Sequence, residues 1–258
     1  MIEIIRNASI ILGATLLRYF FIAGVAFLFF YIFLNKRFKT GKIQAKVLKK
    51  KDIIREVLHS CQSAAVFTGI TLLILFSPIK EYTLIYDNVN DYSYWWLIIS
   101  IVVSFVIHDT YFYWMHRLLH HRKIYKYTHV VHHRSINPSP WASYSFHILE
   151  AIPEGLVLLL LAFILPMHII AISLFTIIGL IINVYGHLGY EIAPKAFRGT
   201  VFFKIVNTSV HHNLHHSRFH GNYSLYFRFW DRIMNTEITD YEKHYDLLQK
   251  KRFPNEKA

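Results

Sequence analysis

Cysteine is almost absent from this sequence: among 258 residues, Cys61 is the only one. A single thiol excludes an internal disulfide framework, a cysteine-ligated zinc finger and an iron–sulfur cluster. Acidic residues are also few, 16 against 28 Lys and Arg, which leaves a formal net charge of +12. The H-E-x-x-H signature that is usual for a hydrolytic zinc site does not occur. No internal repeat, heptad or low-complexity tract is present.

Apolar side chains are abundant, at 54% of the chain, and the mean hydropathy is +0.30. They gather in runs near residues 8–34, 57–77, 94–115, 151–165 and 167–186. A run of about 20 apolar residues is long enough to span a bilayer as a helix. The fourth run is short, and Pro166 separates it from the fifth, so these two predict a helical hairpin. We therefore predict an all-α integral membrane protein, a helical bundle of four or five spans.

The first run contains a charge. It is too long for the core of a signal peptide and lacks a small-residue cleavage site, so we expect it to remain as a span. Arg18 lies near its middle, where a charge is costly in lipid. We therefore expect the span to begin near Leu16, with Arg18 reaching the membrane interface.

Basic residues are distributed unevenly among the connecting segments. Nine Lys and Arg lie in 36–56, five in 116–147 and eleven from residue 190 onward, whereas 78–93 contains only Lys80. Because positive loops face the cytoplasm, the three basic segments are predicted to lie on that side together with every histidine cluster. Basic clusters beside spans indicate contact with anionic lipid, so we predict no nucleic-acid partner.

Histidine is the residue type whose placement is most informative. Eleven of the 17 histidines lie within 116–133 and 211–220. An i,i+4 pair ends an apolar run and places two rings on one helical face. The spacing H-x-x-H-H then occurs twice, in 129–133 and 212–216. The predicted ligands are His116, His120, His129, His132, His133, His212, His215 and His216.

Eight such imidazoles exceed the needs of one tetrahedral or octahedral ion, so the pattern predicts two metal ions in a histidine-rich cap. His187, which ends the last apolar run, is predicted as a ninth ligand. Glu191 is expected to be a ligand or to accept a ligand's other N–H. His108 is expected to support the site through a hydrogen bond, together with Asp109. His121 breaks the facial pattern and is expected to be structural.

Ligand type alone does not identify the metal, because imidazole suits zinc, copper, iron and nickel. Neutral imidazoles leave a metal electron-poor, which favours two irons that activate dioxygen against unreactive C–H bonds. Two other classes stay open: a non-catalytic metal-binding or transport membrane protein, and a zinc-dependent membrane hydrolase. A transporter would hold its ligands near the bilayer midplane. A hydrolase would need a water-activating carboxylate, for which Glu150, Glu154 and Glu191 are the nearby candidates.

Four segments resemble the fatty acid hydroxylase/sterol desaturase superfamily: DTYFYWMHRLLHH, HVVHHRSINPSPWASYSFHILEAI, GHLGYE and HHNLHHSRFHGNYSLYFRFWDRIMNTE. The resemblance covers about residues 95–240. It implies a membrane di-iron oxygenase that hydroxylates or desaturates a lipid of sterol or fatty-acyl type with dioxygen. It implies the eight histidines above and His187 as ligands, and it places His147 and His211 at motif positions. Ile148, Ser224 and Asn235 depart from residues usual in the family, which affects turn geometry more than ligation.

These observations divide the chain into three parts: residues 1–94, with the first spans and a basic loop; 95–240, the catalytic domain; and 241–258, a polar tail. No cytochrome b5-like segment is present, so we expect electrons from a separate cytochrome b5, ferredoxin or flavoprotein reductase. The basic face is suited either to docking an acidic carrier or to contacting lipid headgroups alone. The expected location is a bacterial inner membrane or the endoplasmic reticulum, as a multi-pass protein.

Overall fold

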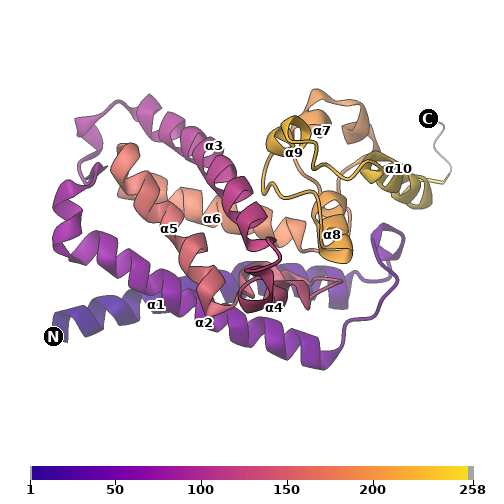
Figure 1. Cartoon of the computed structure of the whole chain (residues 1–258), viewed down its shortest axis with the longest axis horizontal. Helices are drawn as coiled ribbons and strands as arrows, with labels where there is room; N and C mark the ends of the chain where they lie inside the picture. The colour runs from indigo at the N-terminus through magenta and orange to yellow at the C-terminus, as the bar shows by residue number, and fades with distance from the viewer. Residues whose placement is uncertain (1, 255–258) are drawn as a thin grey trace.

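Five long helices form the main body of the molecule, some along its longest axis and others oblique to it (Figure 1). The computed structural model describes residues 2–254. The long helices are α1 (Ile2–Phe27), which continues as the π-helical segment η1 (Leu28–Phe33), α2 (Lys50–Phe76), α3 (Tyr94–Leu119), α5 (Ile148–Ile164) and α6 (Ile169–Gly186). Each corresponds to one of the apolar runs, so the prediction of an all-α bundle is confirmed.

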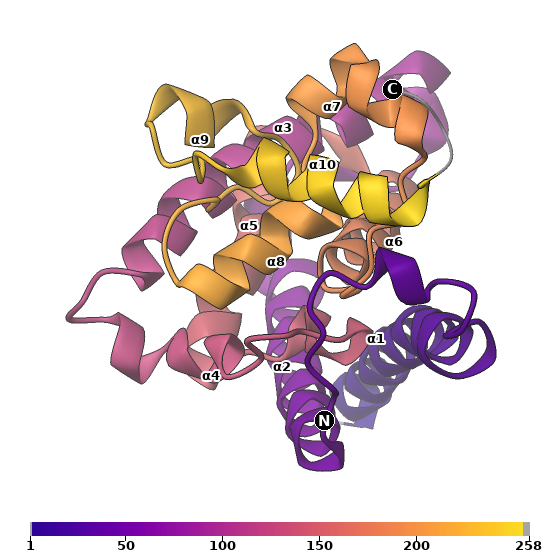
Figure 2. The ribbon, with the colours of Figure 1, turned by 90° about the vertical axis from the view of Figure 1, so that its right-hand side faces the viewer.

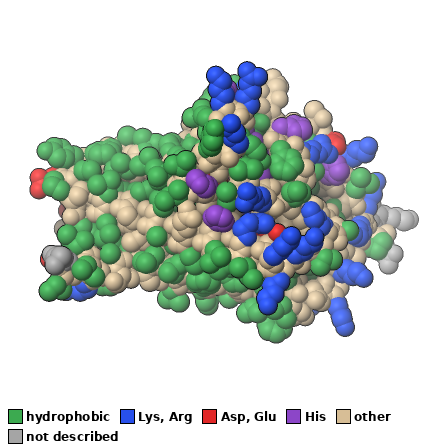
Figure 3. Space-filling view, turned by 60° about the horizontal axis from the view of Figure 1, so that its bottom comes forward, with side chains coloured by type: hydrophobic (Ala, Val, Ile, Leu, Met, Phe, Trp, Pro, Cys, Tyr) green, Lys and Arg blue, Asp and Glu red, His purple; other side chains and the backbone are tan. Residues whose placement is uncertain are grey.

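Four of these helical segments are long and apolar enough to cross a membrane: Ile2–Phe33, Lys50–Phe76, Tyr94–Leu119 and Ile169–Gly186. Only 17–33% of their most apolar windows is buried inside the protein. The remaining apolar surface has no protein to cover it and is suited to lipid. Figure 3 shows hydrophobic side chains over the half of the molecule on the left of the view, and Lys and Arg gathered toward the other end. The chain is therefore a multi-pass membrane protein.

The helix α5 is shorter, with 17 residues, or about 25 Å at 1.5 Å per residue. It packs closely against α2 on one side and leaves Ile152, Phe163 and Ile164 exposed on others. A Cβ added to Gly155 would lie 2.5 Å from Ile70 Cδ1, so glycine permits the approach of α2 and α5. Val157 of α5 and Phe175 of α6 belong to one apolar cluster packed against α3. The predicted hairpin of α5 and α6 is therefore held on a third helix.

The end of the bundle farthest from the histidine clusters is tied by a short parallel pairing. Strand β1 (Ile85–Tyr86) pairs with β2 (Met167–His168), which joins the α2–α3 connection to the α5–α6 turn. Tyr82, Tyr94 and Trp95 lie exposed near this end. Exposed aromatic residues of this kind are typical of a membrane–water interface.

Arg18 is not where the sequence led us to expect it. The helix α1 begins at Ile2, well before Leu16, so Arg18 lies inside the span. Its Nη1 donates to Thr176 Oγ1 of α6 at 2.6 Å. The guanidinium therefore turns into the bundle because a polar partner is available there.

The other end of the molecule is a cap, which we define as residues 120–147 and 187–254. Its elements are η5 (Tyr125–Tyr127), α4 (Val130–His133), η6 (Pro140–Tyr144), η7 (Lys195–Gly199), α7 (Val201–Ile205), α8 (Ser209–Arg218), α9 (Phe229–Ile233) and α10 (Tyr241–Arg252). Figure 2 shows α10 lying along α8 on the outer side of the cap. Tyr241 and Tyr245 of α10 pack against Phe203 and Leu214, so the first part of the predicted tail is a structured helix.

Candidate metal centre

Nine histidines from four segments meet where α3 and α6 end and α4 and α8 lie. They form two groups, within each of which one ring nitrogen per residue lies within 4.8 Å of all the others. The five-histidine group consists of His116, His120, His129, His133 and His215, and the four-histidine group of His132, His187, His212 and His216. All are buried except His120, which is half-buried. These are the nine residues that we predicted as ligands.

Each H-x-x-H-H motif supplies both groups. In the first motif, the i,i+4 pair His129 and His133 belongs to the five-histidine group, and His132 to the other. In the second motif the assignment is reversed: residues 212 and 216 belong to the four-histidine group and His215 to the five-histidine group. Because neighbouring residues on a helix differ by about 100° in direction, adjacent histidines can face two different centres.

Backbone carbonyls orient several of the rings. The Nδ1 atoms of His116, His187 and His215 lie 2.7, 2.8 and 2.7 Å from the carbonyl oxygens of Tyr223, Asn183 and Gly221. A carbonyl only accepts, so each Nδ1 carries the proton and donates it. The Nε2 atom of each ring is then an unprotonated lone pair. The three lone pairs point into the two groups.

Several Nε2 atoms of the two groups approach one another closely. The separations are 2.9 Å for His116 and His129, and 3.0 Å for His187 and His212. The buried Nε2 of His215 has no hydrogen-bond partner among the described residues. Imidazole nitrogens bound to one metal at about 2.1 Å, at right angles, lie about 3.0 Å apart. The donor set and its spacing therefore fit a metal ion in each group.

Burial keeps these rings neutral. It lowers the pKa of His187 and of His215 to about 4. Burial, reinforced by neighbouring imidazoles, also lowers the pKa of His129 and His132 well below the usual value. A neutral imidazole is the form that binds a metal. The site is thus prepared for cations at neutral pH.

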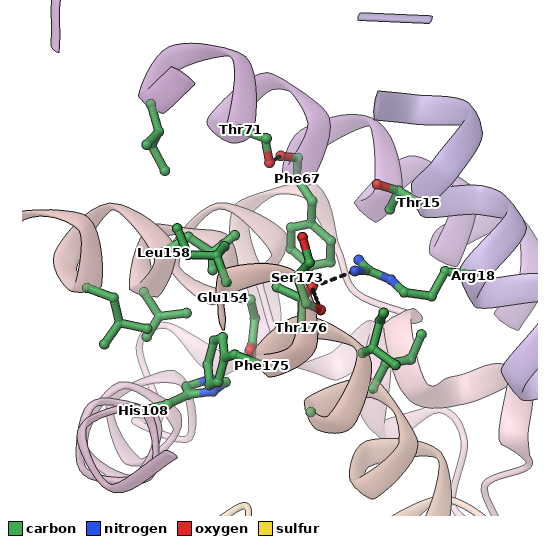
Figure 4. Close-up of a pocket in the computed structure, with 18 of the residues that line it drawn as sticks. Thr15, Arg18, Phe67, Thr71, His108, Glu154, Leu158, Ser173, Phe175 and Thr176 are labelled. Atoms are coloured by element: carbon green, nitrogen blue, oxygen red, sulfur yellow. Dashed lines mark hydrogen bonds between the residues drawn. The ribbon is translucent and has the colours of Figure 1, made fainter. Parts of the chain in front are cut away.

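An apolar cavity of about 510 Å³ opens in the bundle next to the four-histidine group. Its walls come mainly from α1, α2, α5 and α6, and Figure 4 shows part of them. Phe146 and Asn183 line its inner end. The Phe146 ring lies 5.1 Å from that of His132, and the Asn183 carbonyl accepts from His187. The cavity therefore ends against two residues that contact histidines of the four-histidine group.

Known proteins are similar in sequence to this chain. The fatty acid hydroxylase family matches residues 101–236. Lathosterol oxidase of Rattus norvegicus is 30% identical over 225 residues, which cover 86% of this chain and 71% of that protein. The chain belongs to the fatty acid hydroxylase/sterol desaturase superfamily. It is an oxidoreductase.

Other superfamily members have a similar sequence identity to this chain. Lathosterol oxidase of Homo sapiens is 30% identical over 224 residues, with 86% of this chain and 70% of that protein covered. The Delta(7)-sterol 5(6)-desaturase ERG3B of Gibberella zeae is 30% identical over 182 residues, or 70% of this chain and 55% of that protein. No solved structure gives a significant match.

Four further residues lie outside both histidine groups. They lie in or beside the superfamily motifs, and the sequence suggests them as possible ligands or as supporting groups. His108 Nδ1 pairs with the Tyr226 hydroxyl at 3.0 Å, and its side chain lines the cavity. His147 caps α5, where its Nδ1 accepts from Leu149 N. His211 is buried against the Tyr241 ring, because it lies one residue before His212 on α8 and so faces another side of the helix.

Glu191 is the fourth. Its carboxylate accepts from the Tyr185 hydroxyl at 2.8 Å, from the N–H groups of Ile192 and Ala193, and from Val210 N at 3.3 Å. None of these partners is a histidine. Glu191 instead fixes the first turn of α8, the helix that supplies three of the nine rings.

Two carboxylates support the loop that carries the Tyr223 carbonyl. Asp109 Oδ1 accepts from the backbone N–H of Tyr226 at 2.7 Å, and Asp231 accepts from that of Tyr223 at 2.8 Å. Asp109 thus acts on His116 through this loop. The role of Asp231 gave no signal in the sequence, since it depends on a contact that exists only in the folded loop.

Glu150 makes a contact with His129 that the sequence does not predict. The sequence suggests Glu150 only as a possible water-activating group, but its Oε1 lies 2.6 Å from His129 Nδ1, and both side chains are buried. A carboxylate that accepts from a ligand's second nitrogen orients the ring and increases its basicity. The available signal was an acidic residue in the first turn of a mainly apolar helix.

Gly221 provides a test of this support. Its φ is +71°, and an added Cβ would lie 2.6 Å from the Thr236 carbonyl oxygen. We expect Gly221→Ala to lose about 1–2 kcal/mol of stability through backbone strain. It should also lower metal affinity about 10- to 100-fold, because the carbonyl that holds His215 moves.

Thermal unfolding and metal titration of the purified protein measure both effects. Gly199→Ala is the matched control, since an added Cβ there meets nothing within 4 Å. If Gly221→Ala bound metal like the control, the Gly221 carbonyl would not be needed to orient His215.

Proposed function

We propose that this protein is a membrane di-iron oxygenase that hydroxylates or desaturates a lipid, using dioxygen and electrons from a separate donor. The observation that carries the proposal is the junction of two histidine groups with one apolar cavity. The cavity supplies room for a hydrocarbon, and the groups supply a place for two redox metals beside its inner end.

The nine histidines are proposed as the ligands, with one iron in each group. Two irons bound there would supply the oxygen-activating redox chemistry. The four-histidine group has one ligand fewer and borders the cavity at Phe146 and Asn183. We therefore assign the substrate-facing position to this group. Glu150 and the carbonyls of Tyr223, Asn183 and Gly221 hold the rings in place.

The bundle residues would position the substrate. Aliphatic and aromatic side chains from four helices exclude water and hold a hydrocarbon so that one C–H bond reaches the inner end. The relatives are named for sterols, lathosterol and Delta(7)-sterols, which supports a lipid of this size class. The volume of about 510 Å³ is within the range of small-molecule pockets.

The two alternatives have less support. A transporter would place its ligands within the apolar spans, but eight of the nine histidines lie in the cap as defined above, including His187 at the end of α6, and His116 lies in the last turn of α3. A zinc hydrolase would need a free carboxylate beside the metal. Glu150 is engaged by His129, and the hydrogen-bond partners of Glu191 among residues 2–254 include no histidine. The proposed electron donor is a cytochrome b5, ferredoxin or flavoprotein reductase that meets the basic, cytoplasmic cap.

Metal analysis and lipid mass spectrometry test the proposal together. We expect about two irons per purified chain, one for each group. Lipids from cells with and without the gene should differ in one class by one oxygen or by two hydrogens, and the purified reaction should consume dioxygen and reductant. A single zinc with oxygen-independent lipid cleavage would replace this proposal with the hydrolase.

A further inference from the structure

The cavity contains a cation within its apolar walls. Arg18 of α1 lines it together with Thr176 of α6, and Nη1 of Arg18 donates to Thr176 Oγ1 at 2.6 Å. The Thr176 hydroxyl is itself directed to the Ser173 carbonyl, at 2.9 Å. The threonine therefore accepts from the arginine and keeps the guanidinium turned inward, as Figure 4 shows.

Arg18 lacks a counter-ion. Among residues 2–254 no carboxylate forms an ion pair with it; its polar neighbours are the hydroxyls of Thr176 and Tyr144, and its buried Nε has no hydrogen-bond partner. The carboxyl of Glu154 also lines the cavity, but Ser173 and Thr176 lie between it and Arg18 in Figure 4. A guanidinium has five N–H donors and costs about 2.5–3.5 kcal/mol at the centre of a membrane helix. Unused donors and an uncompensated charge both favour an oxygen ligand.

The position of Arg18 relative to the histidines follows from α6. Thr176 precedes Asn183 by seven residues and His187 by eleven, which corresponds to about 10 Å and about 16 Å along a helix. The cavity also continues in the other direction to Ile169. The cation is therefore remote from the four-histidine group, at the level of the middle of the cavity.

We propose that Arg18 and Thr176 form a polar subsite that binds the oxygen-bearing end of an amphiphilic lipid, a carboxylate more tightly than an alcohol. The hydrocarbon part then extends along α6 to Phe146 and Asn183. The subsite deepens the proposed function and rests on it for one consequence: oxidation occurs at a carbon remote from the oxygen-bearing one. Binding itself does not depend on catalysis.

The test is a binding measurement on the full chain in lipid nanodiscs. Radiolabelled palmitate is the probe, and hexadecanol and hexadecane are the competitors. We expect the wild-type protein to bind palmitate most tightly and hexadecane least. Arg18→Met should weaken palmitate binding about tenfold or more and leave hexadecane unchanged, because a charge-assisted contact is lost.

Arg6→Met is the matched control, since Arg6 lies on the same helix, pairs with exposed Glu3 and does not line the cavity. Thr176→Val keeps the charge and should weaken palmitate binding less than Arg18→Met. Because it alters the same subsite, it keeps the proposal testable if Arg18→Met does not fold. Equal affinity of the wild type for palmitate and hexadecane, or unchanged palmitate binding in Arg18→Met, overturns the proposal.

Iron content of the same preparations separates the two claims. Arg18-dependent palmitate binding in a protein without iron would refute the oxygenase and leave the subsite standing. Two irons per chain together with palmitate binding that does not depend on Arg18 would refute the subsite and leave the oxygenase standing.

Discussion

His132→Ala is expected to remove at least one iron per chain and to lower lipid oxidation by more than about 100-fold. The four-histidine group would keep only three rings, and the ligand lost is the one in contact with Phe146 at the inner end of the cavity. Loss of a hydrogen-bond partner behind a ligand already reduces metal affinity or activity about 10- to 100-fold, so loss of the ligand itself should have a larger effect. Metal analysis and a turnover assay on purified protein measure both quantities.

The control for this variant is His121→Ala. His121 is exposed and follows the half-buried ligand His120 directly, but it belongs to neither group. We expect His121→Ala to keep wild-type iron content and activity. If both variants lost iron equally, the effect would come from general disruption of the cap, and the assignment of His132 would be wrong.

Acidification is expected to destabilise the metal-free protein strongly between pH 6.5 and about pH 4. The unfolded pKa of histidine is about 6.5, whereas burial lowers the folded pKa of His187 and His215 to about 4. The unfolded chain therefore binds more protons, so stability is complete above pH 6.5 and is lost as the pH falls toward 4. At pH 5 each of these two rings lowers the free energy of unfolding by about 2 kcal/mol relative to its value above pH 6.5.

Thermal unfolding of chelator-treated protein across this pH range checks the expectation. The iron-loaded protein is the comparison, because bound metal competes with protons for the same nitrogens and should delay the loss to lower pH. An unfolding midpoint that stays constant from pH 7 to pH 5 in the metal-free protein would contradict the idea that these rings are buried and neutral.

Local patterns in the sequence predicted most of the fold and most of the residues of the candidate site. Apolar runs of nearly spanning length gave all five long helices, since length and hydropathy are properties of contiguous residues. The i,i+4 and i,i+3 spacings predicted eight of the nine histidines, because helical geometry fixes which neighbours share a face, and His187 was predicted from its place at the end of the last apolar run. Division of the chain at residues 94 and 240 stays a prediction, although α1 and α2 pack directly against helices of the central part.

Features that depend on contacts between distant segments could not be predicted in the same way. Nothing local distinguishes Glu150, which reaches His129, from Glu191, which anchors α8. The inward direction of Arg18 depends on Thr176, which is 158 residues away in the chain. The division of each histidine motif between two groups also required the relative placement of α4 and α8.

The crossed supply of ligands has a consequence for how the protein acquires its cofactor. Since α4 and α8 each contribute to both groups, an ion bound in one group would fix both helices and so the rings offered to a second ion. We therefore expect uptake of the two proposed ions to be cooperative.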